Sequence, residues 1–192
     1  MVLQNLRGKK IILASKSPRR QQLLKGLDLQ FEVKVSEVNE SYPAGLQGEE
    51  VALFLAKKKA NAYDDIGETE IIITADTVVD LDGRILEKPE THEEAVNMLR
   101  TLSGKQHHVY TGVCIKSATK EVLFFDKTVV QFSDFSDDEI AHYVENYQPF
   151  DKAGSYGAQE FLGYMGIAKL EGSYFNVMGL PTHKLYHALK SF

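Results

Sequence analysis

The sequence predicts an α/β fold built on a mixed β-sheet with helices on its sides. Short apolar, β-branched runs alternate with stretches of helical periodicity, which is the pattern of an α/β protein. Hairpin signals interrupt this alternation, so we expect antiparallel as well as parallel strands. Neither a repeat nor a linker divides the sequence, and 192 residues suit a single domain over residues 1–192.

The N-terminal third is predicted to alternate strands with helices. Ser17 is a typical N-cap residue and Pro18 suits the first helical position, so a helix is expected to begin there. The periodicity predicts strands over residues 10–14 and 31–35, and helices over residues 19–26 and 49–63.

The rest of the chain is predicted from turn signals, capping boxes and alternation. The dipeptide Asp82-Gly83 indicates a hairpin turn. A third strand is expected to run from Ile71 and to end near Asp76. The remaining predicted elements are a helix over 91–102, strands over 108–116 and 121–132, a helix over 136–146, strands over 166–170 and 174–178, and a final helix from Pro181.

The composition argues against several classes of protein. The net charge of −5 does not suit sequence-independent nucleic-acid binding, which depends on Lys and Arg. Apolar runs are shorter than the roughly 18 residues of a membrane span, so no membrane partner is expected. One cysteine, Cys114, allows no internal disulfide, and we expect a cytoplasmic protein because no export signal precedes the first strand.

The segment Leu13–Arg20 is a candidate for phosphate binding. A predicted strand leads directly into a helix N-terminus, where free backbone N–H groups favour anions. Ser15 and Ser17 add hydroxyl donors, and Arg19 or Arg20 can hold a phosphate through two parallel hydrogen bonds. On pattern alone, an ordinary capped helix with solvated arginines explains the segment equally well.

Carboxylates at two places are candidates for catalysis or metal binding. Asp76 follows a strand that should be buried, so its carboxylate can activate a water molecule or hold a divalent metal against phosphates. Position alone equally allows Asp76 to cap a turn. Glu37 and Glu40 follow the second predicted strand, and either can add a metal ligand.

Cationic and amide side chains complete the candidate set. Lys59 on a predicted helix and Lys88 after the hairpin can neutralise phosphate charge. The polar, glycine-bearing loop over residues 150–157 contains Lys152, and Gln159 follows it. An amide both donates and accepts hydrogen bonds, which suits recognition of a base edge.

Several short motifs occur in a fixed order along nearly the whole chain. They are Ser15-Lys16-Ser17-Pro18-Arg19-Arg20, Ser36-Glu37, Lys59-Ala60, Ala75-Asp76-Thr77-Val78, Lys88-Pro89, Leu102-Ser103-Gly104, Asp151-Lys152-Ala153-Gly154 with Tyr156, and Gly179-Leu180-Pro181. In these motifs the chain resembles the Maf family of septum-formation proteins. The resemblance implies the fold of inosine triphosphate pyrophosphatases, an elongated mixed sheet with flanking helices and two lobes around a cleft. It also implies hydrolysis of a nucleoside triphosphate between its α- and β-phosphates.

The resemblance implies a role for each matching residue. Asp76 would activate the attacking water, and Glu37 with Asp76 would hold a divalent cation, Mg²⁺ or Mn²⁺. A homodimer, cleansing of the nucleotide pool and a link to cell-division arrest are also implied. The residues implied to bind the triphosphate are Ser15, Arg19, Arg20, Lys59, Lys88 and Lys152.

Three positions indicate a subgroup of the family. Arg19, Thr77 and Gln159 are similar to those of dTTP and UTP pyrophosphatases, whereas the sister subgroup that acts on 7-methyl-GTP tends to have Trp, Gln and Glu there. Glu160 is a departure, because glycine usually follows the glutamine. A residue other than glycine at this position can change the local backbone conformation, and with it the placement of the Gln159 side chain.

Two rival functions belong to other classes. A non-enzymatic division regulator would bind a nucleotide or a protein partner without turnover and would tolerate Asp76→Asn; the full set of carboxylate and cationic positions argues against it. A phosphotransferase would need an acceptor site and a recognisable nucleotide loop, and the sequence indicates neither.

Overall fold

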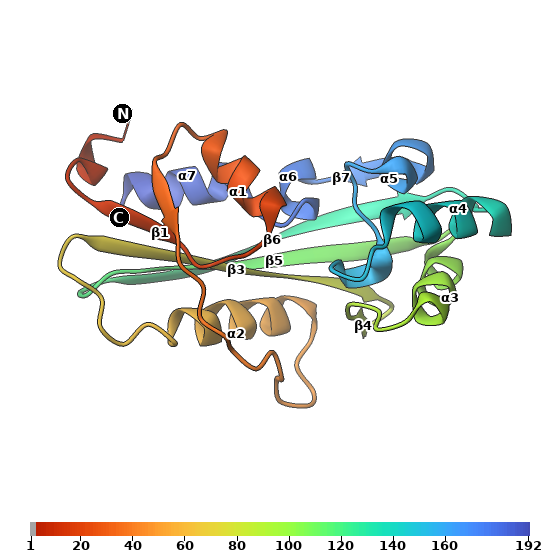
Figure 1. Ribbon diagram of the computed structural model, residues 1–192, viewed down its shortest axis with the longest axis horizontal. Helices are drawn as coiled ribbons and strands as arrows, with labels where there is room; N and C mark the ends of the chain where they lie inside the picture. The colour runs from red at the N-terminus through yellow and green to blue at the C-terminus, as the bar shows by residue number, and fades with distance from the viewer. Residues whose placement is uncertain (1–2) are drawn as a thin grey trace.

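The computed structural model describes residues 3–192 and forms a mixed α/β fold around one long sheet (Figure 1). The strands are β1 (Lys10–Leu13), β2 (Phe31–Val33), β3 (Glu70–Leu81), β4 (Arg84–Leu86), β5 (Gln106–Lys116), β6 (Glu121–Phe132) and β7 (Ile167–Glu171). The helices are α1 (Pro18–Lys25), α2 (Gly48–Ala60), α3 (His92–Leu102), α4 (Asp137–Tyr147), α5 (Phe161–Gly166), α6 (Tyr174–Val177) and α7 (Thr182–Lys190), with short 3-10 helices at Gln4–Leu6 and Ala153–Ser155. Within residues 3–192, none of the helices has the length and apolar character needed to cross a bilayer.

The sheet has the order β2-β1-β3-β5-β6-β7, and β4 also pairs with β3. Strands β1 and β2 run parallel to their neighbours, and the other pairs are antiparallel. On one edge of β3, β1 pairs with Glu70–Ile73 and β4 pairs with Val79–Leu81. Residues 74–78 therefore have a strand neighbour only on the β5 side. Asp76 and Thr77 lie in this gap between β1 and β4 along the edge of β3.

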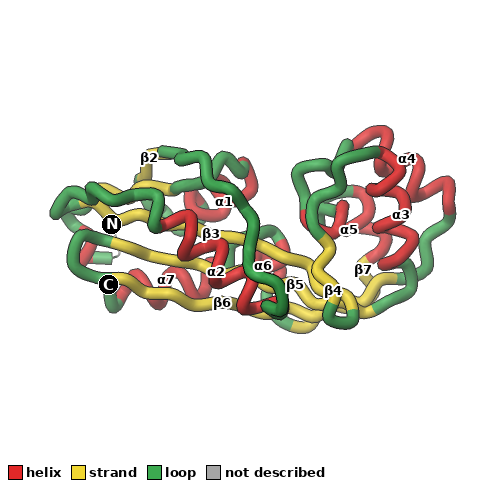
Figure 2. Tube along the Cα trace, turned by 90° about the horizontal axis from the view of Figure 1, so that it is seen from below, coloured by secondary structure: helices red, strands yellow, loops and turns green. Residues whose placement is uncertain are grey.

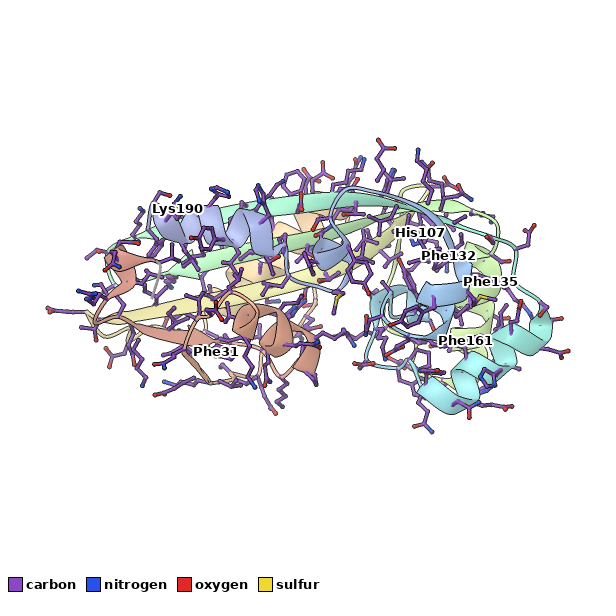
Figure 3. The ribbon with its side chains drawn as sticks, turned by 90° about the horizontal axis from the view of Figure 1, so that it is seen from above. Phe31, His107, Phe132, Phe135, Phe161 and Lys190 are labelled. Carbon is purple, nitrogen blue, oxygen red and sulfur yellow. The ribbon has the colours of Figure 1, made fainter. Side chains whose placement is uncertain are left out.

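Two hydrophobic cores lie at opposite ends of the sheet. Helices α1 and α7 cover one end through residues such as Leu24 and Leu185. Helices α3 and α4 cover the other end, around Phe132. Figure 2 shows α3, α4 and α5 gathered apart from α1, α2 and α7, so the expected two lobes are confirmed. In the second lobe His107, Phe132 and Phe135 point toward one another (Figure 3), and the ring centroids of Phe132 lie 4.8 Å and 4.9 Å from those of the other two.

Helix α2 packs on the sheet face opposite α1 and α7. Its residues Val51, Ala52 and Leu55 contact Val78 of β3 and Tyr110 of β5. Side chains alternate between the faces of a strand, so Thr74 and Asp76 face α2 whereas Thr77 faces α1, as their hydrogen bonds to Ala56 and Lys59 and to Arg20 require.

Most predicted elements are confirmed, and two predictions were wrong. The strand from Ile71 does not end near Asp76 but continues to Leu81, because pairing with β5 is unbroken from Ile72 to Asp80. Residues 174–178 were expected to form a strand and instead form helix α6. Ser173 caps that helix by accepting a hydrogen bond from the Asn176 backbone N–H, which outweighs the aromatic and β-branched composition.

Candidate active site

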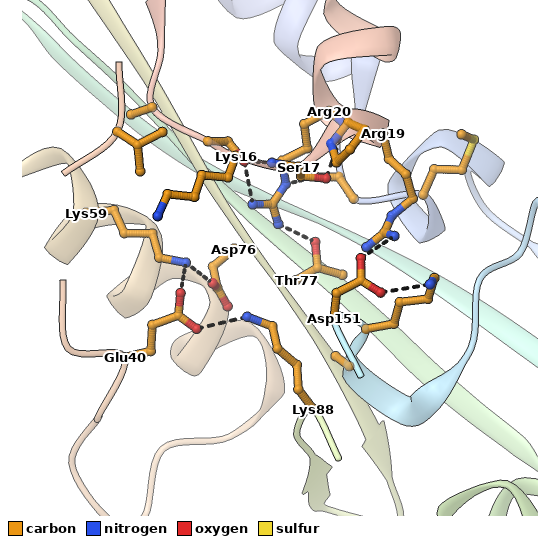
Figure 4. A pocket seen from close by; sticks show the side chains of 18 of the residues that line it. Lys16, Ser17, Arg19, Arg20, Glu40, Lys59, Asp76, Thr77, Lys88 and Asp151 are labelled. Atoms are coloured by element: carbon orange, nitrogen blue, oxygen red, sulfur yellow. Dashed lines mark hydrogen bonds and ion pairs between the residues drawn. The ribbon is translucent and has the colours of Figure 1, made fainter. Parts of the chain in front are cut away.

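A cleft of about 830 Å³ opens at the gap in the edge of β3, between the two lobes (Figure 4). All the residues that the sequence analysis assigned to the site line this one cleft: Ser15, Arg19, Arg20, Glu37, Lys59, Asp76, Thr77, Lys88, Lys152 and Gln159. They come from α1, α2, β3 and four connecting segments. The fold thus brings together residues separated by up to 144 positions in the sequence, Ser15 and Gln159.

The N-terminus of α1 supplies the first group of donors. Ser17 caps the helix and accepts a hydrogen bond from the Arg20 backbone N–H, as predicted. Arg20 is held on three sides: Nε donates to the Gly179 carbonyl at 2.8 Å, and the terminal nitrogens donate to Thr77 at 3.0 Å and to Ser15 at 3.5 Å. Burial lowers the pKa of the Arg20 guanidinium. An arginine side chain nevertheless stays protonated in proteins, and the three hydrogen bonds hold the positive charge of Arg20 in place at the cleft.

The Thr77 hydroxyl forms hydrogen bonds with two other side chains, those of Arg20 and Thr111. The Thr111 hydroxyl donates to the Asn176 carbonyl at 3.0 Å, so the 2.9 Å contact between the threonines takes its hydrogen from Thr77. Thr77 in turn accepts from Arg20. A directed chain of hydrogen bonds thus runs from Arg20 through Thr77 and Thr111 to α6, which orients Arg20.

A second group of charges surrounds Asp76. The Lys59 ammonium lies 2.5 Å from Asp76 Oδ1 and 2.8 Å from Glu40 Oε1. Lys88 contacts the other Glu40 oxygen at 3.2 Å. Partial burial raises the pKa of Glu40, but hydrogen bonds and charges of Lys59 and Lys88 outweigh it and lower the pKa to about 2. Glu40 therefore stays ionised and bridges two lysines.

The opposite wall of the cleft has a similar arrangement. Asp151 contacts Arg19 at 3.1 Å and Lys152 at 2.8 Å. Burial raises the pKa of Asp151, but these two cations reverse the shift and lower it. Each of the two carboxylates, Glu40 and Asp151, thus holds two cations in the cleft.

The departure at Glu160 does not strain the backbone. Glu160 has φ −114° and ψ 179°, an extended conformation that any residue adopts, and it precedes helix α5. Gln159 remains at the cleft with its amide oxygen buried and unpartnered within the described residues. The unusual residue therefore does not displace Gln159 from the site.

The donor set fits a divalent metal held partly by substrate. Oxygens of Asp76 and Glu40 already converge on one cation, the Lys59 ammonium. Across residues 3–192 no three His, Cys, Asp or Glu side chains group closely enough to form a metal cage. Two carboxylates together with substrate phosphates are a usual coordination for Mg²⁺. Glu37 lines the same cleft, so its predicted role stays a prediction.

Three residues of the cleft were not assigned a role from the sequence or were given only a secondary one. Glu40 was named together with Glu37 as a candidate metal ligand and had no role in the final assignment, and Asp151 and Lys16 were quoted only as parts of longer motifs. Lys16 lines the cleft and points into it in Figure 4, and it makes no ion pair among those found in residues 3–192. The sequence signal for Lys16 was its place inside the predicted phosphate segment. The ion pairs of Glu40 with Lys59 and Lys88, and of Asp151 with Arg19, depend instead on contacts between distant segments.

The chain is similar to known proteins over nearly its whole length. The family model described as "Maf-like protein" matches residues 10–192. A protein of Porphyromonas gingivalis named dTTP/UTP pyrophosphatase is 53% identical over 195 residues, covering 100% of this chain and 98% of that protein. A protein of Bacteroides fragilis with the same name is 52% identical over 191 residues, covering 98% of this chain and 99% of the other. A solved HAM1 protein from Coxiella burnetii covers 96% of this chain and 100% of its own at 14% identity, with a TM-score of 0.49.

Proposed function

The chain belongs to the family of Maf-like proteins, and on that premise we propose that it hydrolyses dTTP and UTP to the nucleoside monophosphate and pyrophosphate. The observation that carries the proposal is a carboxylate, Asp76, set in the gap of the sheet edge and surrounded by cations from both lobes. Relatives about half identical over their full length and named dTTP/UTP pyrophosphatase support the same reaction.

The charge of the cleft suits a triphosphate. The chain carries a net charge of −5, yet the lining of the cleft contains six Lys and Arg side chains against four Asp and Glu, an excess of two positive charges. A cationic cleft in an acidic protein concentrates small polyanions. The net charge of −5 disfavours contact with the many phosphates of an extended nucleic acid, which favours a mononucleotide.

In the proposed reaction Asp76 accepts a proton from a water molecule that attacks the α-phosphorus, and pyrophosphate leaves. Lys59 and Arg20 offset the negative charge that develops on the phosphate oxygens, since both are held in place before substrate arrives. Asp76 and Glu40 would hold a divalent cation, which when bound neutralises phosphate charge. No covalent intermediate with the protein is required.

The proposed base preference rests on the amide of Gln159. Its buried, unpartnered oxygen can accept a hydrogen bond from the N3–H of uracil or thymine. Cytosine has no hydrogen on N3, and purines are larger. An acceptor in this place therefore favours the two pyrimidine diones.

The test is pyrophosphate release from a panel of dTTP, UTP, CTP, ATP and GTP with Mg²⁺ or Mn²⁺. We expect kcat/KM for dTTP and UTP to exceed the others by at least about tenfold. Binding of nucleotides without release from any of them would contradict the enzyme and favour a nucleotide-binding regulator of septum formation.

Two variants in the same segment test whether Glu40 or Glu37 is the second metal ligand. Glu40→Gln is expected to raise the metal concentration for half-maximal activity by about tenfold or more, because Glu40 shares a cation with Asp76. Glu37→Gln removes the same charge nearby and serves as the comparison. Metal titrations at saturating nucleotide measure both, and a larger shift for Glu37→Gln would assign the ligand to Glu37 instead.

Family membership also leads us to propose a cytoplasmic homodimer that removes unwanted nucleotides and affects septum formation. Light scattering coupled to size-exclusion chromatography tests the dimer, and a monomer at micromolar concentration would contradict it.

A further inference from the structure

Glu160 joins three parts of the second lobe through one carboxylate. Oε1 lies 3.2 Å from the ammonium of Lys152, and Oε2 accepts a hydrogen bond from the hydroxyl of Tyr143 on α4. The same hydroxyl accepts from the Gly157 backbone N–H at 2.9 Å. Both oxygens of Glu160 are thus committed to the protein, and both partner side chains are buried.

Lys152 has two carboxylate partners that differ in exposure. The side chain of Asp151 is 58% exposed and is shared with Arg19, whereas that of Glu160 is 19% exposed. An entering phosphate competes most readily with the exposed, solvated partner. Glu160 is therefore the partner that holds Lys152 in place when the cleft is filled.

The segment from Gly157 to Glu160 forms a tight turn over the cleft. The Glu160 N–H donates to the Gly157 carbonyl at 3.1 Å. A Cβ at Gly157 would lie 2.7 Å from the Glu160 carboxyl carbon and 3.0 Å from Gln159 Nε2, so the turn is packed against both side chains. Tyr143 fixes the first residue of this turn, and Glu160 is the last. The placement of the Gln159 amide therefore depends on the link between Tyr143 and Glu160.

We propose that Glu160, acting with Tyr143, is a positioning residue that sets both the ammonium of Lys152 and the amide of Gln159 in the cleft. This inference rests on the proposed function, because it assigns to the pair the control of phosphate binding and of base discrimination. Tyr143 and Glu160 need not touch the nucleotide. They act through two residues that line the cleft.

Two variants separate the two effects. Tyr143→Phe removes the hydroxyl that fixes Gly157 but leaves the pair between Glu160 and Lys152. We expect the ratio of kcat/KM for UTP over CTP to fall about tenfold, the effect of one hydrogen bond involving a charged group, while kcat for UTP changes less than about twofold. Glu160→Gln turns an amide toward Lys152, so KM for UTP is expected to rise about tenfold in addition.

Coupling between the two residues gives a further readout. If they act as one unit, the UTP over CTP ratio of the double variant is no lower than that of Glu160→Gln alone. Tyr147→Phe, on the same helix with its ring stacked on Tyr143, and Glu145→Gln, exposed on α4, are the matched controls. Both are expected to keep the wild-type ratio and KM.

The same variants remain informative if no triphosphate is hydrolysed. Titration calorimetry with inorganic tripolyphosphate, UTP and CTP then measures binding directly, so failure of the enzyme proposal is distinguished from failure of this one. Tripolyphosphate affinity should fall in Glu160→Gln but not in Tyr143→Phe. The inference is overturned if the UTP over CTP ratio and the affinities of both variants stay at wild-type values, with or without a loss of thermal stability. Should Glu160→Gln not fold, Tyr143→Phe alone decides through the UTP over CTP ratio.

Discussion

Asp76→Asn is expected to lower kcat for pyrophosphate release from dTTP and UTP by about 10³-fold, within the range for loss of a general base. The side chain of Asp76 is 9% exposed and faces the cleft from the middle of β3. Asparagine has nearly the same shape but does not accept the proton. Lys59 keeps its second carboxylate, Glu40, at 2.8 Å, so the local fold should survive. Stopped assays with pyrophosphate detection measure the loss, and unfolding curves check the fold.

Asp80→Asn is the matched control for this prediction. Asp80 is buried in the same strand and on the same face, but its carboxylate accepts a hydrogen bond from the Gly83 N–H in the hairpin and does not line the cleft. Asparagine can accept the same bond, so activity should stay within about twofold of wild type. An Asp76→Asn protein that kept a tenth of its activity would contradict the assignment of the base.

Gly112→Ala is expected to destabilise the protein by about 3 kcal/mol, at the upper end for overpacking a close contact. A Cβ at this position of β5 would lie 2.3 Å from the carbonyl oxygen of Ala52 and 2.7 Å from the N of Leu53. These atoms belong to the backbone of α2 and cannot rotate away. The whole helix must move off the sheet. A drop in Tm of about 6 to 12 °C is expected for a chain of this size.

The same substitution should also impair catalysis. Gly112 is the pairing partner of Asp76 in the sheet, and α2 carries Lys59 to its contact with Asp76. A displaced helix therefore carries Lys59 away from the base. Gly67→Ala is the control, because a Cβ there meets side-chain atoms of Glu70 at an ordinary 3.5 Å. Unchanged stability in Gly112→Ala would show that α2 does not require this close approach.

Local chemistry made much of the fold predictable. The cap at Ser17 and the capping box of Ser136 and Glu139 are formed as expected, because each uses residues three positions apart. Strand β6 begins and ends at the predicted residues, and it is rich in β-branched and aromatic residues. The errors at Asp76 and at residues 174–178 have another origin. Pairing with β5 prolongs β3, an effect that is not local. At residues 174–178 the local cap at Ser173 is supported by non-local contacts of Asn176 with Val109 and Thr128, and together they favour the helix.

The set of residues that line the site was more predictable than the ion pairs that these residues form. The sequence motifs singled out Asp76 and the Lys and Arg residues expected to bind phosphate, and the fold brings all of them to one cleft. The ion pairs of Glu40 with Lys59 and Lys88, and of Asp151 with Arg19, join segments that are far apart in sequence. Sequence spacing carries no information on such contacts, because charged side chains choose partners only once the lobes are in place.

The unbroken course of β3 also bears on how a ligand is captured. A hinge needs a few residues free to change their φ and ψ angles, whereas residues 72–80 of β3 are each paired with β5 beneath both lobes. These residues of β3 are therefore not free to act as a hinge between the two lobes. On the proposed function, binding of a triphosphate would exchange one set of ionic contacts for another: phosphate oxygens would replace Glu40 and Asp151 at cations that are already in position. The affinity would then depend on the difference in free energy between these two sets of ionic contacts, and added salt would weaken both sets.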